Sequence, residues 1–525
     1  MKTITKVGLA VLSGLLIAAA WPVNGLVPLA FIAFVPLLYL QDRIGDKENP
    51  EKGSIFCLSF ITFLIWNALT TWWVWKTTAA GTIAMILLNS LFMTCVFWAF
   101  HFVKTRLYDN KKGYYVLIIF VLAFEYLHLN WQLNWPWLNL GNVFSHYHSW
   151  VQWYEFTGIA GGTIWVLLAN ILAYKLLVNY KKLHVLYVLL ALFVPLIISK
   201  LIYACYDEQG DAVEIIVVQP NLDPYSEEFT LTPQEIMLRN LSVAAPLMTD
   251  STRFVVSPES AIQENIWLDR IDKYYSIREL RRFIEKYPKT CYVIGISAYG
   301  NVPEGHETDF AARRFANADK YFYAYNTATM ITADTIQLYH KSRLTPGAES
   351  MPSWWILRML KNHALDLGGT VGTLQKDTEA RVLAFDNHKI APLICYESVF
   401  GEYVTEFVRK GADMLFVITN DGWWGDSPGH KQHLEFSKLR AIETRRSVAR
   451  SANTGISGFI NQRGDIVEQS GYWEQTALRH SIKTNEKLTF YARFGDYLYK
   501  IAVFMTALLV ALTIVKLIIG KQWKH

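Results

Sequence analysis

The 525-residue chain lacks a strong excess of either charge, and it lacks paired cysteines. Its formal net charge is only +5, so nothing in the charge balance indicates a nucleic-acid partner. The five cysteines, at positions 57, 95, 205, 291 and 395, form no CxxC pair, and two of them lie in apolar runs. Neither a zinc site nor a disulfide framework is indicated, and we expect no metal and no cofactor.

Apolar residues, by contrast, make up 52% of the chain, which includes 19 tryptophans that a wholly soluble enzyme would find hard to bury. Most of its long apolar runs can span a bilayer, at about 20 residues per ~30 Å of hydrocarbon. Charges are scarce within them, which argues against a transport path. The runs cover residues 7–22, 25–40, 54–75, 79–103, 115–130, 162–179, 185–203 and 501–519.

The first run has an alternative interpretation as a cleaved signal peptide, because Lys2 and Lys6 precede it and it ends in three alanines. A second span follows after a very short turn, which favours a retained span. Lys and Arg are concentrated in the loops after the second, fourth and sixth runs, and those after the first and fifth carry none. By the positive-inside rule both termini are cytoplasmic, and the segment after the seventh span faces outward.

Two ionisable residues, Glu125 and His128, fall within or at the end of the fifth run. An ionisable group at that depth is costly unless it meets a partner or water. A structural hydrogen bond and a role at a lipid headgroup are both open interpretations. The Trp-rich stretch after this run is typical of an interfacial aromatic belt.

From about residue 206 to 490 the composition changes to that of a soluble α/β domain. We predict a seven-span domain over 1–205, an extracytoplasmic α/β domain over 206–490, and a C-terminal span with its tail over 491–525. A long insert contains Trp354 and Trp355 and is a candidate lid or membrane-dipping arm. Strands are expected at 213–219, 253–257, 292–297, 389–395 and 414–419, and helices at 233–248, 277–286 and 433–446.

Three apolar strands of this domain end in a reactive residue: RFVVSPES delivers Glu259, QLYHKSR delivers Lys341, and KIAPLICYES delivers Cys395. Taken singly, the cysteine would be a buried structural thiol and the two charges surface groups. If the three residues met at one edge of the sheet, however, they would form a nucleophilic site. The Glu would take the thiol proton, and the Cys would attack a carbonyl. The Lys would lower the thiol pKa and stabilise an oxyanion.

His430 and His433 are candidate metal ligands, because they stand three residues apart at the start of a predicted helix. No third-ligand motif such as HExxH accompanies them. A polar helix face or a lipid headgroup contact is the favoured interpretation.

The segments VVSPES, HKSRLTPGAE, LICYES, and NDGWWGD with RSANTGISG resemble the Glu, Lys and Cys blocks of the nitrilase (carbon-nitrogen hydrolase) superfamily. With seven spans before this domain and one after it, the chain is similar to the bacterial apolipoprotein N-acyltransferases. The resemblance implies a membrane α-helical bundle of eight spans plus a nitrilase-like αββα sandwich. It also implies that Cys395 is the nucleophile, Glu259 the general base and Lys341 the oxyanion-stabilising residue.

The same resemblance implies supporting and substrate-binding residues. The chain departs from the family's pattern at Gly347-Ala348-Glu349, at Trp423-Trp424-Gly425 and in the segment DPYSEEF after the first strand. The implied supporting residues are Glu349, Tyr396, Glu397, Asn420, Trp423, Trp424, Tyr225 and Phe229.

The implied activity is a two-step acyl transfer in the bacterial inner membrane. A phospholipid would acylate Cys395, and the α-amine of a diacylglyceryl-cysteine apolipoprotein would then accept the chain as an amide. A monomer is expected, with the bilayer and these two amphiphiles as its partners. The alternatives are a membrane-tethered nitrilase-type amidase, and a transporter or receptor whose outer domain only binds ligand.

Overall fold

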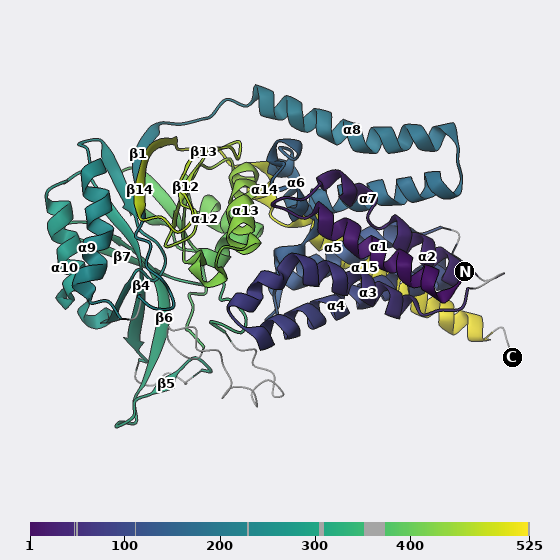
Figure 1. The fold of residues 1–525 in the computed structure, drawn as a ribbon, viewed down its shortest axis with the longest axis horizontal. Coiled ribbons are helices and arrows are strands. Elements are labelled where there is room, and N and C mark those ends of the chain that lie inside the picture. The colour runs from purple at the N-terminus through teal and green to yellow at the C-terminus, as the bar shows by residue number, and fades with distance from the viewer. Residues whose placement is uncertain are drawn as a thin grey trace. The chain divides into compact units, whose positions relative to one another are not determined.

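The computed structural model describes residues 1–46, 48, 51–110, 112–227, 230–303, 309–350 and 373–522, and its chain forms two compact units (Figure 1). One unit comprises Met1–Cys205 with Phe494–His525, and the other comprises Tyr206–Arg493. The predicted insert tryptophans, Trp354 and Trp355, lie outside the described residues.

The first unit is helical. Within the described residues, seven of its helices are long and apolar enough to cross a membrane, and α5 is a shorter apolar helix of 16 residues. The predicted membrane bundle is therefore confirmed, with α5 at the position of the fifth expected span. Its helices are α1 (Thr3–Ala20), α2 (Val35–Gly45), α3 (Ile55–Thr71), α4 (Ala79–Leu107), α5 (Tyr115–Asn130), α6 (Tyr154–Thr157), α7 (Ile159–Val178), α8 (Lys182–Cys205) and α15 (Tyr497–Gln522).

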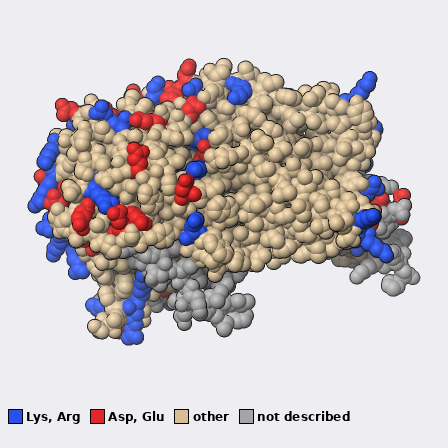
Figure 2. Space-filling view, viewed as in Figure 1, with Lys and Arg blue, Asp and Glu red and all other residues tan. Residues whose placement is uncertain are grey.

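The surface of this unit is apolar over a broad band. In α8 only 6% of the most apolar window is buried within the protein, so most of its side chains are available to lipid. Figure 2 shows few charged residues over the middle of the unit and a group of Lys and Arg at the end where both chain termini lie. This distribution is typical of a bundle that crosses a bilayer.

Glu125 of α5 is buried in the helical unit, where its carboxylate is hydrogen-bonded to other parts of that unit. Its carboxylate accepts hydrogen bonds from the Leu140 backbone N–H at 2.7 Å, from Thr163 Oγ1 at 2.8 Å and from Tyr499 OH at 3.1 Å. These partners come from a loop and from two other helices, α7 and α15. Of the two open interpretations, the structural hydrogen bond is therefore the one that the geometry favours for Glu125.

The second unit contains two β-sheets. Among the described residues, one sheet has eight strands in the order β14-β1-β2-β4-β6-β5, with β3 beside β4 and β7 beside β6. Its strands are β1 (Ala212–Gln219), β2 (Thr252–Val256), β3 (Ile262–Trp267), β4 (Cys291–Asn301), β5 (Arg313–Arg314), β6 (Tyr321–Ile331), β7 (Ile336–His340) and β14 (Thr476–Lys483).

The other sheet has six strands among the described residues, in the order β13-β12-β11-β10-β9-β8. Its strands are β8 (Leu383–Phe385), β9 (His388–Ile394), β10 (Met414–Thr419), β11 (Val448–Ala452), β12 (Gly458–Ile460) and β13 (Ile466–Gln469). The helices of the unit are α9 (Pro233–Ala244), α10 (Tyr275–Glu285), α12 (Gly401–Arg409), α13 (Pro428–Thr444) and α14 (Phe490–Phe494).

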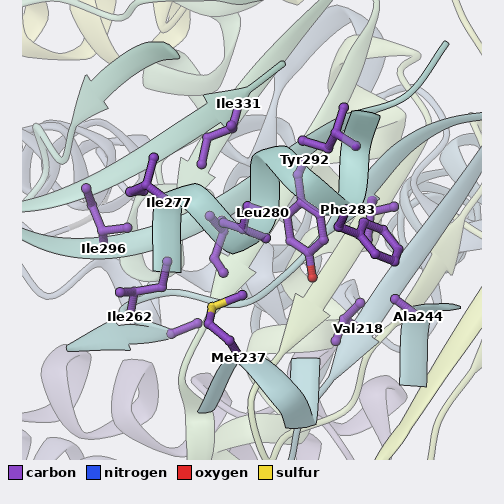
Figure 3. Close-up of a cluster of buried hydrophobic side chains, with 14 of the residues drawn as sticks. Val218, Met237, Ala244, Ile262, Ile277, Leu280, Phe283, Tyr292, Ile296 and Ile331 are labelled. Atoms are coloured by element: carbon purple, nitrogen blue, oxygen red, sulfur yellow. The ribbon is translucent and has the colours of Figure 1, made fainter. Parts of the chain in front are cut away.

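The two sheets pack face to face between helices. Phe254 of β2 meets Phe416 of β10 with ring centroids 5.2 Å apart, and Ser451 Oγ of β11 donates to the Val218 carbonyl of β1 at 2.6 Å. Helices α9 and α10 cover the outer face of the first sheet. Figure 3 shows Met237 and Leu280 from these helices packed with Tyr292 of β4 in that buried cluster. Helices α12 and α13 pack on the second sheet, so the predicted αββα sandwich is confirmed.

Strand direction decides which residues meet. Strands β2 and β4 run parallel, β6 is antiparallel to β4, and β7 is antiparallel to β6, so β2 and β7 end at the same edge of the first sheet. In the second sheet β9, β10 and β11 are parallel. The residues that follow these strands are thus delivered to sheet edges as a set, which is where open α/β folds bind ligands.

Candidate active site

The described residues bring three predicted strand-end residues, Glu259, Lys341 and Cys395, into one cluster. Glu259 follows β2 by three residues, Lys341 follows β7 directly, and Cys395 follows β9 directly. Lys341 Nζ donates to Glu259 Oε1 at 2.9 Å. Lys341 is also electrostatically coupled to the Cys395 thiol. Glu259 and Cys395 are 136 positions apart in the chain, yet both share one site with Lys341.

Lys341 lies between two carboxylates. Its Nζ donates to Glu349 Oε1 at 2.9 Å as well as to Glu259, and only 1% of the lysine is exposed. Asn326 of β6 bridges the same two acids, since its Nδ2 donates to Glu259 at 2.7 Å and to Glu349 at 3.0 Å. The Thr345 backbone N–H holds the other Glu349 oxygen at 2.9 Å. The lysine is therefore held in one position by groups from three separate segments.

The charges of this cluster follow from its geometry. Burial lowers the pKa of Lys341, but Glu259 and Glu349 outweigh burial and raise it well above its ordinary value. Burial likewise raises the pKa of Glu349, but Lys341 overcomes that effect and lowers it below the ordinary value. The Lys341 ammonium and the Glu349 carboxylate thus stabilise each other's charged forms.

The Cys395 thiol has an environment that differs from the sequence-based expectation. Desolvation and the Glu259 carboxylate raise the pKa of the thiol well above its ordinary value. Lys341 lowers this pKa, as predicted, but its effect is the smaller one. The resting group is therefore a neutral thiol, and an attack through sulfur requires a base to take its proton.

The backbone at Cys395 also identifies it as a special position. Cys395 has φ = 49°, in the left-handed region that residues other than glycine rarely adopt. It begins the short helix η9 (Cys395–Val399), so the chain turns sharply between strand and helix at the thiol. Non-glycine residues in this conformation cost about 1–3 kcal/mol each and cluster at functional sites.

Glu397 connects the cysteine turn to the lysine turn. Its Oε1 accepts from the backbone N–H groups of Ser342 at 2.7 Å and Arg343 at 3.2 Å, and from Tyr339 OH at 2.5 Å. Its Oε2 accepts from the Ile394 N–H at 2.9 Å. Burial raises the pKa of Glu397 to about 7, and these donors oppose the rise. Glu397 therefore fixes the residues next to both Lys341 and Cys395.

Replacing Glu397 with glutamine is expected to lower the thermal unfolding midpoint, because an amide NH₂ would face the Ile394 N–H. A buried donor left without an acceptor costs about 1–3 kcal/mol. Tyr339→Phe is the matched control, since it removes one donor and keeps the carboxylate. Its expected cost is about 1 kcal/mol or less. Equal midpoints for the Glu397→Gln variant and the unmodified protein would contradict this role.

His433 lies beside the cysteine rather than on a polar helix surface. It is fully buried, as is His430, so neither histidine lies on an exposed face of the helix. His433 Nε2 lies 3.1 Å from the Cys395 carbonyl, and its Nδ1 lies 3.0 Å from Asp421 Oδ1. His430 stacks on Tyr472 with centroids 4.3 Å apart. The two histidines therefore have different environments and do not act as a ligand pair.

Cys395, Asp421 and His433 offer atoms that lie within 4.8 Å of one another, a spacing that a metal ion could use. Arg450 Nη2, however, donates to Asp421 Oδ2 at 2.5 Å and lies 3.1 Å from His433 Nδ1. A fixed guanidinium at this distance opposes a divalent cation. These residues therefore fit a metal poorly.

The other predicted residues have different environments. Asn420 donates its backbone N–H to Glu259 Oε2 at 3.1 Å, and Tyr396 is buried against Phe400. Tyr225 is 58% exposed and donates its hydroxyl to the Trp423 carbonyl at 2.8 Å. The Trp424 ring meets the His433 ring with centroids 5.7 Å apart. Phe229 lies outside the described residues.

Two family descriptions match the chain. Residues 13–172 match the apolipoprotein N-acyltransferase N-terminal domain, and residues 300–486 match carbon-nitrogen hydrolase. The apolipoprotein N-acyltransferase of Chlorobaculum tepidum is 28% identical over 510 residues, covering 93% of this chain and 92% of the relative. That of Geobacter metallireducens is 27% identical over 510 residues, covering 93% and 91%.

Solved structures of the nitrilase superfamily also match. Saccharomyces cerevisiae Nit3 aligns with 53% of this chain and 93% of its own, at 16% identity and a TM-score of 0.39.

Proposed function

Because the chain belongs to the apolipoprotein N-acyltransferase family, we propose that it moves a fatty acyl chain from a membrane phospholipid to an apolipoprotein through a Cys395 thioester. The acceptor is the N-terminal α-amine of a diacylglyceryl-cysteine. The observation that carries the proposal is the buried Glu259–Lys341–Glu349 cluster beside Cys395, in a chain with seven helices that can cross a membrane among its described residues.

The two units divide the work in this proposal. Residues 1–205 and 491–525 anchor the protein in the inner membrane with both termini cytoplasmic, and residues 206–490 form the extracytoplasmic catalytic domain. The Lys and Arg residues in the loops after the second, fourth and sixth apolar runs support this orientation. Both substrates are amphiphiles, so anchoring raises their effective concentration at the site.

In the first step the Cys395 sulfur attacks the ester carbonyl of the phospholipid, and Glu259 takes the thiol proton. The carbonyl oxygen becomes an oxyanion, which the Lys341 ammonium stabilises. Collapse of this intermediate breaks the ester C–O bond, and protonated Glu259 gives its proton to the leaving lysophospholipid oxygen. The products are an acyl thioester on Cys395 and a lysophospholipid.

In the second step the α-amine of the lipoprotein attacks the thioester carbonyl. Glu259 takes a proton from the amine, the C–S bond breaks, and the sulfur regains a proton as the thiol. The product is an amide-linked third acyl chain. Water must be kept from the thioester, and we assign that role to the half-buried rings of Trp423 and Trp424.

Incubation of the full-length protein with a labelled phospholipid tests the proposal. We expect intact-protein mass spectrometry to show one acyl adduct, with release of labelled lysophospholipid and transfer of the adduct to an added diacylglyceryl-cysteine peptide. Cys395→Ala should form no adduct. Cys291→Ala, which removes a buried thiol of β4 with a similarly raised pKa, is the matched control and should still form it.

The amidase alternative predicts a different result. An amidase would hydrolyse a short amide, and it would release no lysophospholipid from the labelled donor. A ligand-binding receptor would form no covalent adduct with either compound. Either outcome would contradict the proposed acyl transfer.

A further inference from the structure

Two buried side chains hold the Cys395 carbonyl. It accepts hydrogen bonds from Ser398 Oγ at 2.8 Å and from His433 Nε2 at 3.1 Å. His433 Nε2 and Ser398 Oγ are themselves 2.9 Å apart. Both residues are fully buried, so water cannot replace either donor.

Because Ser398 Oγ–H donates to the Cys395 carbonyl, the two groups within reach of His433 Nε2, this carbonyl and the Ser398 oxygen, are both acceptors, and Nε2 carries a proton. The other ring nitrogen, Nδ1, faces an acceptor, Asp421 Oδ1 at 3.0 Å, and a donor, Arg450 Nη2 at 3.1 Å. A doubly protonated ring donates from Nδ1 to Asp421, and a neutral ring accepts at Nδ1 from Arg450. In both states the proton on Nε2 remains.

The groups behind His433 are fixed in turn. Asp421 Oδ1 accepts from Thr419 Oγ1 at 2.7 Å, and Asp421 Oδ2 accepts from Arg450 at 2.5 Å. Asp421, His433 and Arg450 are each 0% exposed. Asp421 lies in the short helix η10 (Asp421–Trp424) that follows β10, His433 lies in α13 and Arg450 lies in β11, so three elements support one imidazole.

The carbonyl of Cys395 belongs to the same planar peptide as the N–H of Tyr396. That peptide is trans, so its N–H points opposite to its C=O. Holding the carbonyl toward His433 therefore fixes the direction of the Tyr396 N–H on the other side of the turn. That N–H is one bond from the nucleophilic residue and is aimed away from α13.

We propose that His433, held from behind by Asp421 and Arg450, is a positioning residue that orients the Tyr396 N–H as a second oxyanion donor beside Lys341. The inference rests on the proposed thioester chemistry. The contact of His433 that carries the proposal is with the Cys395 carbonyl, which takes no part in the reaction. His433 acts through the Cys395–Tyr396 peptide, and it matters only for reactions that form an oxyanion.

Two reactions of the same thiol separate this role from simple structural support. Acylation of Cys395 by an aryl ester passes through an oxyanion, whereas alkylation by iodoacetamide does not. Both rates are measured in the full-length protein and in two variants. His433→Gln keeps an N–H donor near the position of Nε2, whereas His433→Asn keeps a group only near the position of Nδ1.

His433→Asn is expected to lower the acylation rate by about 100-fold, as loss of an aimed oxyanion donor does, while the KM for the ester stays within about threefold. Alkylation should remain within about threefold in both variants, and His433→Gln should keep acylation within about tenfold of the unmodified protein. Parallel loss of both reactions, or unchanged acylation in His433→Asn, would overturn the inference.

Ser398→Ala provides a second test that keeps the Asp421, His433 and Arg450 side chains, should His433→Asn fail to accumulate. It removes the other donor to the carbonyl, so acylation should fall by about tenfold with alkylation preserved. Unchanged acylation in that variant would also overturn the inference. Because the aryl ester replaces the phospholipid, failure of the lipid reaction alone would contradict the proposed function and leave this comparison intact.

Discussion

Glu259→Gln is expected to lower the rate at which phospholipid acylates Cys395 by about 10³-fold, within the range observed for loss of a general base. The reason lies in the thiol, whose pKa is raised well above its ordinary value by desolvation and by Glu259 itself. A neutral thiol is a poor nucleophile, and an amide side chain cannot take its proton. Single-turnover acylation with a labelled phospholipid measures the effect.

The same variant gives a second result with the opposite sign. Since the Glu259 carboxylate raises the pKa of Cys395, its removal should lower that pKa, and alkylation by iodoacetamide should reach its plateau at a lower pH. Glu264→Gln is the matched control, because Glu264 accepts from two backbone N–H groups at 3.0 Å outside the catalytic cluster. It should change neither reaction. Acylation within about threefold of the unmodified rate in Glu259→Gln would exclude the general-base role.

Lys341→Met is expected to remove both activity and stability. Loss of an oxyanion-stabilising donor lowers acylation by about 10²–10³-fold. The variant also leaves Glu259 and Glu349 buried without their cation, which costs about 3–5 kcal/mol. For a unit of this size that cost corresponds to a fall of about 6–20 °C in the unfolding midpoint. Tryptophan fluorescence in detergent measures the midpoint at a fixed heating rate.

The stability loss in Lys341→Met should depend on pH. In the unmodified protein the pKa of Glu349 is lowered, so its contribution is present above the ordinary pKa and is lost as pH falls through the folded value. Without Lys341, burial is the main remaining influence and raises that pKa, so protonation stabilises the variant. The difference in midpoint should therefore be larger at about pH 8 than at about pH 5.

Lys410→Met is the control for this pair of measurements. Lys410 Nζ lies 2.9 Å from Glu379, but both side chains are exposed, at 42% and 78%. Solvent screens such a pair, so its removal should leave the midpoint and its pH dependence nearly unchanged. A Lys341→Met protein that behaved like Lys410→Met would show that the buried carboxylates do not depend on the lysine.

The membrane helices and the strand ends could be predicted from the sequence, because each depends on a local pattern of apolar residues. The run at 185–203 became α8, and the apolar runs before Glu259 and Cys395 became β2 and β9. In each case the apolar residues alone specify burial, and the first polar residue marks where the strand leaves the core. The positions of these two strand ends needed no knowledge of the rest of the chain.

Contacts between segments that are distant in the chain could not be predicted from the sequence. Asn326 contributes to the site from the middle of β6, a long strand that was not predicted and whose sequence there has no reactive pattern. Arg450 reaches Asp421 and His433 only because β10 and β11 are adjacent and parallel. Such a juxtaposition is a property of the assembled sheet, so a single sequence without related sequences gives no signal for it.

Helix α13 shows why the burial of His430 and His433 could not be predicted from the sequence. Its sequence is rich in charged residues, which is typical of an exposed helix, yet almost every residue is buried. The charges are paired within the helix: Lys438 Nζ lies 2.6 Å from Glu435, and Arg440 Nη2 lies 2.8 Å from Glu443. Internal pairing makes burial of a polar helix possible, and a hydrophobicity pattern cannot detect it.

The pairing of Lys341 with two acids also sets the electrical balance of the reaction. With Glu259 ionised, as its proposed role as base requires, the buried group of Glu259, Lys341, Glu349 and a neutral Cys395 thiol carries one net negative charge before attack. When the thiol proton moves to Glu259 and the oxyanion forms, the net charge is the same. Only the location of the negative charge changes, from the Glu259 carboxylate to the oxyanion, and the Lys341 ammonium lies beside both. No ion has to enter or leave a poorly hydrated site during the step, so the barrier contains no cost of transferring net charge from water.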